Sequence, residues 1–374
     1  MPRALFIVNH NATIYNVRRE LLQRLVGNGF EVFIAVPTHE RNQAFRDLGC
    51  TVIDTPVSRF GTNPIIELAT IARFVRVIRK VSPDVVLTYT VKANAYGGIA
   101  AQVCRVPYIG TVTGLGAVFQ SSGLLQQISA NLQRLAFRKA HKVFFQNSTN
   151  LETFRNLSIV GEQAALVPGS GVNLKLHSLE PYSLDQGITR FIAISRIRRD
   201  KGFDELFEAV RRIHSDRTDV AFDVVGWYDD ESYREVVADM QAHFPVRFHH
   251  DVTQERVHEL ISHSHCLLHP SHHEGMANVI LEAAAAGVPC IASDIPGCRE
   301  AVEEGVTGWL HAVGDVDSLT DGITNFLHTG WETRRSIGLA ARKKMEAQFD
   351  RERVVDHYVS EILGAIEAQQ QEVA

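Results

Sequence analysis

The sequence predicts an α/β protein made of two doubly wound, parallel-sheet domains. Short apolar runs alternate with segments of helical periodicity along the whole chain, which is the pattern of repeated βαβ units with right-handed crossovers. The length of 374 residues also exceeds the size at which one hydrophobic core keeps growing. Two domains of somewhat under about 200 residues each are therefore expected.

Each apolar run is interpreted as a strand of one of the two sheets. The first six runs are Ala4–Val8, Glu31–Val36, Thr51–Val57, Asp84–Thr88, Tyr108–Val112 and Lys142–Gln146. The second six are Arg190–Ser195, Ala221–Val225, Val246–His249, His265–His269, Pro289–Ser293 and Gly308–His311. Glycines and a proline interrupt the pattern at Val167–Asn173. We therefore place the domains at residues 1–168 and 169–350, followed by residues 351–374 with a helix at about Arg351–Ala368.

Ligands of doubly wound sheets bind at the carboxyl ends of the strands. Two such domains facing one another predict one interdomain cleft. The loops expected to line it from the first domain are Asn9–Asn16, Thr88–Tyr96 and Thr111–Phe119. Those from the second domain are Ser195–Gly202, Gly226–Tyr228, His249–Val252 and His272–Asn278.

Charge is distributed unevenly along the chain. Residues 1–170 carry 18 basic and 9 acidic residues, whereas residues 171–374 carry 20 basic and 34 acidic residues. The basic side chains gather in two amphipathic helical stretches, as Arg73, Arg76, Arg79, Lys80, Arg134, Arg138, Lys139 and Lys142. Such surfaces favour an anionic membrane face or a diphosphate-linked acceptor, and an ordinary solvated helix face is the alternative. Nucleic acid is not expected, because the chain as a whole is acidic and has no nucleic-acid motif.

The cysteines and histidines do not form a metal-binding pattern. The five cysteines are widely spaced, without a CxxC pair, and are expected as free buried thiols in a reducing compartment. The histidine clusters lack ligand spacing. Asp315 and Asp317 spell a DxD motif, but Asp315 is expected to cap a helix near Ser318. With no run of eighteen apolar residues and no leader pattern, a cytoplasmic protein is expected.

Two glutamates flank a predicted strand-to-helix junction. A helix is expected to start near Gly275, and Glu274 and Glu282 stand around that start with seven residues between them. At about 1.5 Å per helical residue their carboxylates would lie roughly 12 Å apart, a separation suited to the sugar and the ribose of a nucleotide-sugar. Helix starts also expose unpaired N–H groups and a partial positive charge. The pattern is compatible with a nucleotide-sugar site, although acidic residues also occur in first helical turns for dipole reasons alone.

A second motif follows the strand Arg190–Ser195. Arg196, Lys201 and Gly202 form an R-x(4)-K-G turn. Together with the two glutamates, this turn resembles the family 4 retaining glycosyltransferases of the GT-B fold. Glycosyl transfer builds negative charge on the departing diphosphate, which two fixed cations would stabilise in the transition state.

The resemblance implies the roles of the site residues. Arg196 and Lys201 would bind the diphosphate, Glu274 the donor sugar and Glu282 the ribose. The other donor-binding residues would be Gly226, Gly275, Met276, Ala277, Asn278 and Val279. It further implies a retaining reaction, a UDP-sugar as substrate, and a C-terminal helix that returns to the first domain. No metal or other cofactor is expected, because ligand spacing is absent and Arg196, Lys201 and a helix dipole would neutralise the charge. Whether Glu274 is a nucleophile or an electrostatic stabiliser is left open, as is UDP against GDP.

The first domain carries a narrower resemblance. The segments Thr88–Gly97 and Thr111–Phe119 are similar to those of the subgroup that adds hexoses or N-acetylhexosamines to polyprenyl-diphosphate-linked glycans. Thr113-Gly114 stands where many members of the wider family have a histidine, and Ala93 where the subgroup often has proline. The residues assigned to the acceptor are Asn16, Arg18, Lys92, Tyr96, Thr113 and Gly114.

The function expected from these observations is sugar transfer to a lipid-linked glycan in the assembly of bacterial surface polysaccharides or glycans, at the inner face of the cytoplasmic membrane. The partners would be a nucleotide-sugar donor, the lipid-linked acceptor and an anionic membrane surface. Two alternatives stay open: a nonhydrolysing UDP-sugar 2-epimerase, which needs a different acid/base set, and a catalytically silent partner subunit. Intact Arg196, Lys201, Glu274 and Glu282 argue against the silent subunit.

Overall fold

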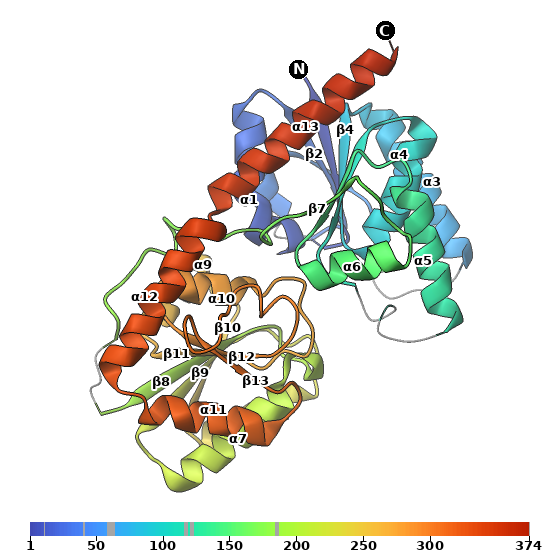
Figure 1. The fold of residues 1–374 in the computed structure, drawn as a ribbon. Helices are drawn as coiled ribbons and strands as arrows, with labels where there is room; N and C mark the ends of the chain where they lie inside the picture. The colour runs from blue at the N-terminus through green and yellow to red at the C-terminus, as the bar shows by residue number, and fades with distance from the viewer. Residues whose placement is uncertain are drawn as a thin grey trace. The chain divides into compact units, whose positions relative to one another are not determined.

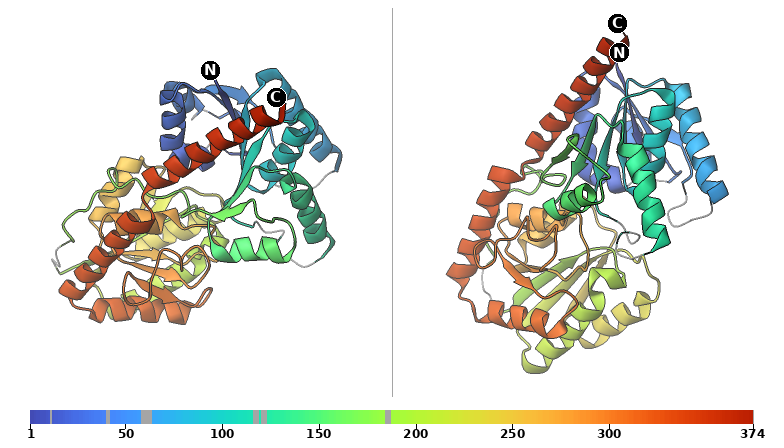
Figure 2. Two further views of the ribbon diagram at one scale, coloured as in Figure 1. Left: turned by 45° about the horizontal axis from the view of Figure 1, so that its top comes forward. Right: turned by 45° about the vertical axis from the view of Figure 1, so that its right-hand side comes forward.

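The computed structural model describes residues 1–10, 12–39, 42–57, 64–115, 119, 123–183 and 187–373. The chain forms two compact units, one of residues 1–170 and 351–374 and the other of residues 171–350. Each has helices on both faces of one sheet (Figures 1 and 2). The division falls between Ser170 and Gly171, shortly after the boundary expected from sequence. Parts of two predicted site loops, residues 11 and 116–118, lie outside the described residues.

The first unit is built on a seven-stranded sheet in the order β3-β2-β1-β4-β5-β6-β7. Its strands, all paired in parallel, are β1 (Arg3–Ile7), β2 (Glu31–Val36), β3 (Thr51–Asp54), β4 (Val85–Tyr89), β5 (Tyr108–Val112), β6 (Lys142–Phe145) and β7 (Ala164–Leu166). The pattern predicts six of them, but β7 was missed because its three residues are too short to stand out. The strand order reverses between β1 and β4, which makes their carboxyl ends a topological switch point.

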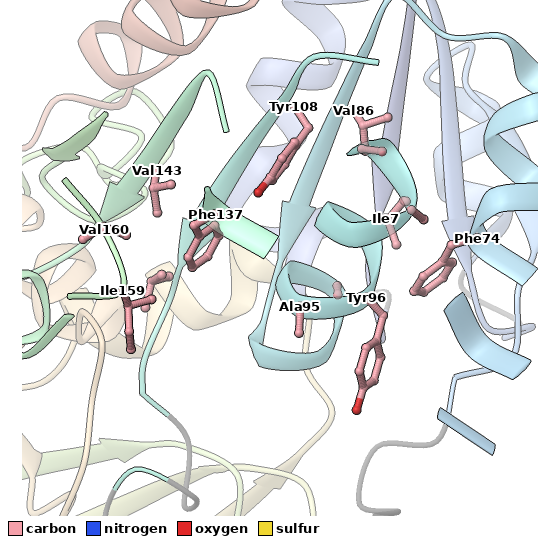
Figure 3. Packing of buried hydrophobic residues seen from close by; sticks show 14 of the residues in the cluster. Ile7, Phe74, Val86, Ala95, Tyr96, Tyr108, Phe137, Val143, Ile159 and Val160 are labelled. Atoms are coloured by element: carbon pink, nitrogen blue, oxygen red, sulfur yellow. The ribbon is translucent and has the colours of Figure 1, made fainter. Parts of the chain in front are cut away.

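Alternate residues of β1 face two separate cores. Leu5 and Ile7 belong to a cluster with residues of the helices on one face. Ala4 and Phe6 belong to a cluster with residues of α1 (Ala12–Gly27) and α13 (Arg351–Val373) on the other. Figure 3 shows part of the first cluster, in which Phe74 of α3 lies beside Ile7. The helices are α1 (Ala12–Gly27), α2 (Gln43–Asp47), α3 (Pro64–Val81), α4 (Gly98–Cys104), α5 (Leu124–Phe137), α6 (Ser148–Asn156) and α13 (Arg351–Val373).

The C-terminal helix α13 packs on the first unit, as the predicted fold requires (Figure 1). Tyr358 of α13 is fully buried, and its hydroxyl lies 3.1 Å from a guanidinium nitrogen of Arg18 and 2.9 Å from Thr111 Oγ1. Glu352 and Asp356 form ion pairs with Arg24 of α1. The helix thus adds acids to a basic unit, which then holds 20 basic and 14 acidic residues.

The second unit is built on a six-stranded sheet in the order β10-β9-β8-β11-β12-β13. Its strands are β8 (Thr189–Ile194), β9 (Val220–Gly226), β10 (Val246–His250), β11 (Cys266–His269), β12 (Cys290–Ser293) and β13 (Trp309–His311). All are parallel and all are predicted. The helices are α7 (Phe203–Asp216), α8 (Tyr233–His243), α9 (Gln254–Ser262), α10 (Asn278–Ala285), α11 (Val316–His328) and α12 (Trp331–Gln348). The order reverses between β8 and β11, so the loops after these two paired strands meet at the switch point.

All five cysteines are free thiols, four of them buried and Cys104 half-buried, as expected. Within the described ranges, no helix has the length and apolar character needed to cross a membrane.

Candidate active site

A buried ion pair joins the two loops at the switch point of the second unit. Lys201 follows β8, Glu274 follows β11, and the Lys201 ammonium lies 2.7 Å from Glu274 Oε1. The same ammonium donates to Ser271 Oγ at 3.2 Å and to the His273 carbonyl at 3.3 Å. The two charged side chains are only 11% and 17% exposed. Two residues separated by 73 positions and expected at one site are thus in direct contact.

Glu274 is held as a carboxylate. Burial opposes its ionisation, but the charge of Lys201 and a hydrogen bond from His269 outweigh burial and lower its pKa from 4.5 to about 2. His269 Nε2 lies 3.2 Å from the same oxygen, Oε1, that Lys201 contacts. The site therefore presents a fixed negative charge at neutral pH.

Two glycines allow the segment after β8 to approach its neighbours, the loop after β11 and the end of β9. Gly202 has φ +72°, and a Cβ there would lie 2.0 Å from the carbonyl oxygen of Pro270 in the loop after β11. A Cβ on Gly226, at the end of β9, would lie 1.9 Å from the carbonyl oxygen of Ser195. Neither distance is tolerable, so a side chain at either position would push the loops apart. Close packing against Pro270 therefore requires a glycine at position 202 of the R-x(4)-K-G turn, independently of any ligand.

The helix that carries the second glutamate starts later than expected. The prediction of a start near Gly275 was wrong, because α10 begins at Asn278. Residues before it run without helical hydrogen bonds, and the Ala277 N–H donates to the Gly297 carbonyl at 3.2 Å. Glu274 thus lies outside the helix and Glu282 within it, so the roughly 12 Å separation, which assumed one continuous helix, does not apply.

The residues around the start of α10 are buried or half-buried. Met276 and Ala277 are 5% and 2% exposed, whereas Asn278, Val279 and Glu282 are half-buried. The Asn278 Oδ1 is buried and accepts no hydrogen bond from the described residues. A buried acceptor without a hydrogen bond destabilises the folded protein unless a water molecule or a ligand hydroxyl donates one.

Arg196 forms an ion pair with Asp229, an acidic residue that was not among the predicted site residues. Its guanidinium donates to Asp229 Oδ2 at 2.8 Å, and that oxygen also accepts from Arg198 at 3.1 Å. Backbone hydrogen bonds join the same two loops, including Ile197 N–H to the Trp227 carbonyl at 2.9 Å. In this structure the two cations expected on one diphosphate are each paired with a carboxylate, Arg196 with Asp229 and Lys201 with Glu274.

Asp229 and His269 were both absent from the predicted site. Asp229 lies in the loop after β9, and His269 is the polar last residue of an apolar strand. A polar residue at the carboxyl end of a parallel strand is the signal that could have identified each.

The acceptor-binding residues predicted in the first unit differ in their surroundings. Lys92 pairs with Glu67 at 2.6 Å, and burial together with Glu67 raises the pKa of Tyr96 to about 12, so these three residues lie together. Arg18 instead lies in the core, 2% exposed and with its guanidinium 4.7 Å from the centre of the Tyr358 ring. We therefore no longer assign Arg18 to the acceptor: it contacts α13 in the core and has almost no surface accessible to a ligand.

The remaining predicted acceptor residues lie nearer the surface. Asn16 is exposed, and its carbonyl accepts a 3.5 Å hydrogen bond from Arg351. Thr113 and Gly114 are half-buried in the loop after β5.

No group of three or more His, Cys, Asp or Glu side chains within the described ranges is arranged to hold a metal ion. His249 and His272 instead pair singly with Asp223 at 2.7 Å and Glu205 at 2.9 Å. Asp315 caps α11 by accepting from the Ser318 N–H at 3.0 Å, as predicted, although the helix begins at Val316.

Comparison with known families finds two matches, one in each unit. Residues 14–169 match the family described as "Glycosyl transferase 4-like domain". Residues 180–344 match "Glycosyl transferases group 1". The second match contains Arg196, Lys201, Glu274 and Glu282.

Two relatives align over much of the chain. One is the N,N'-diacetylbacillosaminyl-diphospho-undecaprenol alpha-1,3-N-acetylgalactosaminyltransferase of Campylobacter jejuni, 26% identical over 95% of this chain and 96% of its own. The other is the capsular polysaccharide biosynthesis glycosyltransferase CapM of Staphylococcus aureus, 24% identical over 76% of this chain and 77% of its own. Among solved structures, Anabaena HepE in complex with UDP-glucose matches with a TM-score of 0.78 at 18% identity, covering 98% of this chain and all of the other. At that identity the likeness bears on the fold.

Proposed function

Because this chain belongs to the group 1, family 4 type of glycosyltransferases with the GT-B fold, we propose that it transfers a hexose or N-acetylhexosamine from a UDP-sugar to a polyprenyl-diphosphate-linked glycan with retention of configuration. The observation that carries the proposal is the buried Lys201–Glu274 pair at the switch point of the second unit. It supplies a cation for the diphosphate and an ionised acceptor for sugar hydroxyls within one hydrogen bond of each other. A relative whose name describes transfer to a diphospho-undecaprenol-linked sugar supports the class of acceptor.

In this proposal the second unit binds the donor. Lys201 and Arg196 contact the diphosphate, exchanging part of their present carboxylate contacts for it. Glu274 accepts hydrogen bonds from ring hydroxyls, and Glu282 binds the ribose. The unsatisfied Asn278 Oδ1 takes a hydroxyl of the donor. As the bond between the anomeric carbon and the diphosphate oxygen breaks, the two cations stabilise the charge that develops there.

The state of Glu274 favours an electrostatic role over a nucleophilic one. A carboxylate whose pKa is about 2, with Oε1 accepting two hydrogen bonds, is a weak base and a weak nucleophile. We therefore propose that the acceptor hydroxyl attacks from the face that the diphosphate leaves. The departing phosphate oxygen takes the hydroxyl proton.

The first unit in this proposal binds the acceptor and the anionic inner face of the cytoplasmic membrane. Lys92 and Tyr96 are its acceptor residues. Helix α3 exposes Ile65 and Leu68 near its start, 79% and 66% accessible, and its last two turns expose basic side chains. Those basic side chains are Arg76, Arg79 and Lys80. Apolar and basic residues exposed on one helix suit a lipid surface.

Three of the basic residues predicted for that surface are bonded within the first unit. Arg73 donates to the Pro56 carbonyl, and Arg134 donates to the Leu157 and Ser158 carbonyls at the end of α6. Lys142 lies 3.2 Å from Glu361 of α13. We therefore leave these three residues out of the proposed membrane surface.

A donor screen tests the proposal. The purified protein is incubated with UDP-GalNAc, UDP-GlcNAc, UDP-glucose, UDP-galactose and GDP-mannose, with lipid extract from bacterial membranes as acceptor. We expect lipid-dependent release of UDP from one sugar nucleotide and incorporation of that sugar into lipid, both lost in Glu274→Ala. Release of GDP would refute the UDP assignment. Formation of an epimer without transfer would favour the 2-epimerase, and no turnover with any donor would favour a silent subunit.

A further inference from the structure

We propose that His269 is a positioning residue for this reaction: it holds one oxygen of Glu274 so that the other faces the donor sugar. The inference rests on the proposed function, since it assigns Glu274 to the sugar. It adds a residue that the motifs do not contain.

His269 is well placed to hold its partner rigidly. It is the last residue of β11, is 4% exposed, and is paired in the sheet with Ala292 of β12. A side chain fixed by strand pairing and burial loses little freedom when it makes a further hydrogen bond. Its Nε2 lies 3.2 Å from Glu274 Oε1. Because an ionised carboxylate only accepts hydrogen bonds, Nε2 carries the proton.

The two oxygens of Glu274 have different surroundings. Oε1 accepts from both Lys201 and His269, at 2.7 and 3.2 Å. Oε2 accepts no hydrogen bond from the residues that the structure describes. A carboxylate oxygen has two lone pairs, so Oε1 is saturated by the protein while Oε2 is the oxygen with capacity for sugar hydroxyls.

Lys201 alone would hold the carboxylate poorly during the reaction. Its ammonium is also the cation proposed for the diphosphate, and a doubly charged diphosphate competes with Glu274 for it. His269 is assigned no contact with the diphosphate, so the diphosphate does not compete for it. When Lys201 turns toward the diphosphate, the imidazole keeps Oε1 in place and supports the ionised state of a side chain that burial would otherwise neutralise.

The test compares binding of the nucleotide with binding of the nucleotide-sugar. Calorimetry measures the Kd of UDP, and steady-state assays measure KM and kcat for the UDP-sugar that gives the fastest release in the donor screen, starting with UDP-GalNAc. For His269→Leu we expect the Kd of UDP to stay within about twofold of wild type. The KM for the UDP-sugar should rise and kcat fall, together lowering kcat/KM by about tenfold to a hundredfold, as expected for losing a hydrogen bond to a charged group.

A pair of polar variants separates positioning from packing. The side-chain nitrogen of glutamine reaches the position of an imidazole Nε2, whereas that of asparagine is too short. His269→Gln should therefore recover most of the lost kcat/KM and His269→Asn should not. This pair also decides the question if His269→Leu fails to fold. His311→Leu is the control, because His311 is 4% exposed at the end of β13 but bonds to Ser293 and Ala312 instead of Glu274.

Each outcome has one meaning. Equal kcat/KM for His269→Leu and wild type, or for the Gln and Asn variants, would overturn the inference. So would equal losses of UDP and UDP-sugar binding, which indicate a structural role. Failure of the wild-type protein to bind UDP or turn over any sugar nucleotide would instead overturn the proposed function on which the inference rests.

Discussion

Replacing Lys201 by methionine should impair both catalysis and the stability of the second unit. The substitution keeps the length of the side chain but removes the cation that contacts Glu274 at 2.7 Å. The transfer rate should fall at least about a hundredfold, comparable to losing one donor to a developing anion. The stability effect arises because a mostly buried carboxylate loses its principal partner.

The size of the stability effect follows from the pKa of Glu274. Its folded pKa of about 2, against an ordinary 4.5, favours the ionised form by about 3 kcal/mol at ~1.4 kcal/mol per pKa unit. The charge of Lys201 is the largest favourable cause, ahead of His269. Since Glu274 is 17% exposed, some of the lost interaction is recovered from water. We expect Lys201→Met to lower the free energy of unfolding by about 2 kcal/mol at pH 7.

The loss should depend on pH in a defined direction. In the wild type the lowered pKa contributes stability that is present above pH 4.5 and lost as the pH falls toward 2. In the variant the pKa of Glu274 rises, because the charge of Lys201 no longer opposes burial while His269 still favours the ionised form, so part of that stability is lost. The difference in stability between wild type and variant should therefore be larger at pH 7 than at about pH 3, where the wild type approaches its own lowered pKa.

Tryptophan fluorescence provides a selective assay. All three tryptophans, Trp227, Trp309 and Trp331, lie within residues 171–350, so urea denaturation followed by their emission reports on the unit that holds the ion pair. Arg199→Ala is the control. Arg199 lies on the same turn but is 84% exposed, and its loss should change stability by less than about 0.5 kcal/mol. Unchanged stability of Lys201→Met, or an equal loss at about pH 3 and pH 7, would refute the assignment of a buried charge pair.

Three further outcomes are expected. Glu282→Ala should raise the KM for the nucleotide-sugar about tenfold with little change in kcat, because a ribose contact is made equally in the ground and transition states; a fall in kcat alone would contradict this. A chelator should leave turnover within about twofold, since fixed cations and the start of α10 supply the positive charge; loss of activity restored by magnesium or manganese would show otherwise. Replacing Arg76, Arg79 and Lys80 by glutamine should lower binding to anionic vesicles at least about tenfold, at ~1 kcal/mol per charge, with less effect in high salt; equal binding of wild type to neutral and anionic vesicles would refute an electrostatic surface.

The strands and the main motifs could be predicted from the sequence because they depend on the order of residues within short segments. Twelve of the thirteen strands in the described residues coincide with predicted apolar runs, since burial on both faces of a parallel sheet demands continuous apolar residues. The same reasoning located the loops that follow β8 and β11. It also identified Asp315 as a helix cap.

Contacts between residues far apart in the sequence could not be predicted in this way. Arg18 had the character of a ligand-binding residue in the sequence, and only the return of α13 across 340 positions shows that Tyr358 covers it. The charge of the first unit was likewise overstated by taking residues 1–170 alone, because the acids of α13 belong to that unit.

The sequence by itself determined that this is a two-domain α/β chain, because continuous apolar runs along single strands suffice for that conclusion, and its Arg196–Gly202 and Glu274–Glu282 segments carry the resemblance to glycosyltransferases. Only the tertiary structure decided that Lys201 and Glu274 share a hydrogen bond, that His269 is the second donor to the same oxygen, and that Asp229 holds Arg196. The physical reason is that a carboxylate's ionisation and orientation depend on groups within a few ångströms, and parallel-sheet pairing brings such groups together from distant parts of the chain.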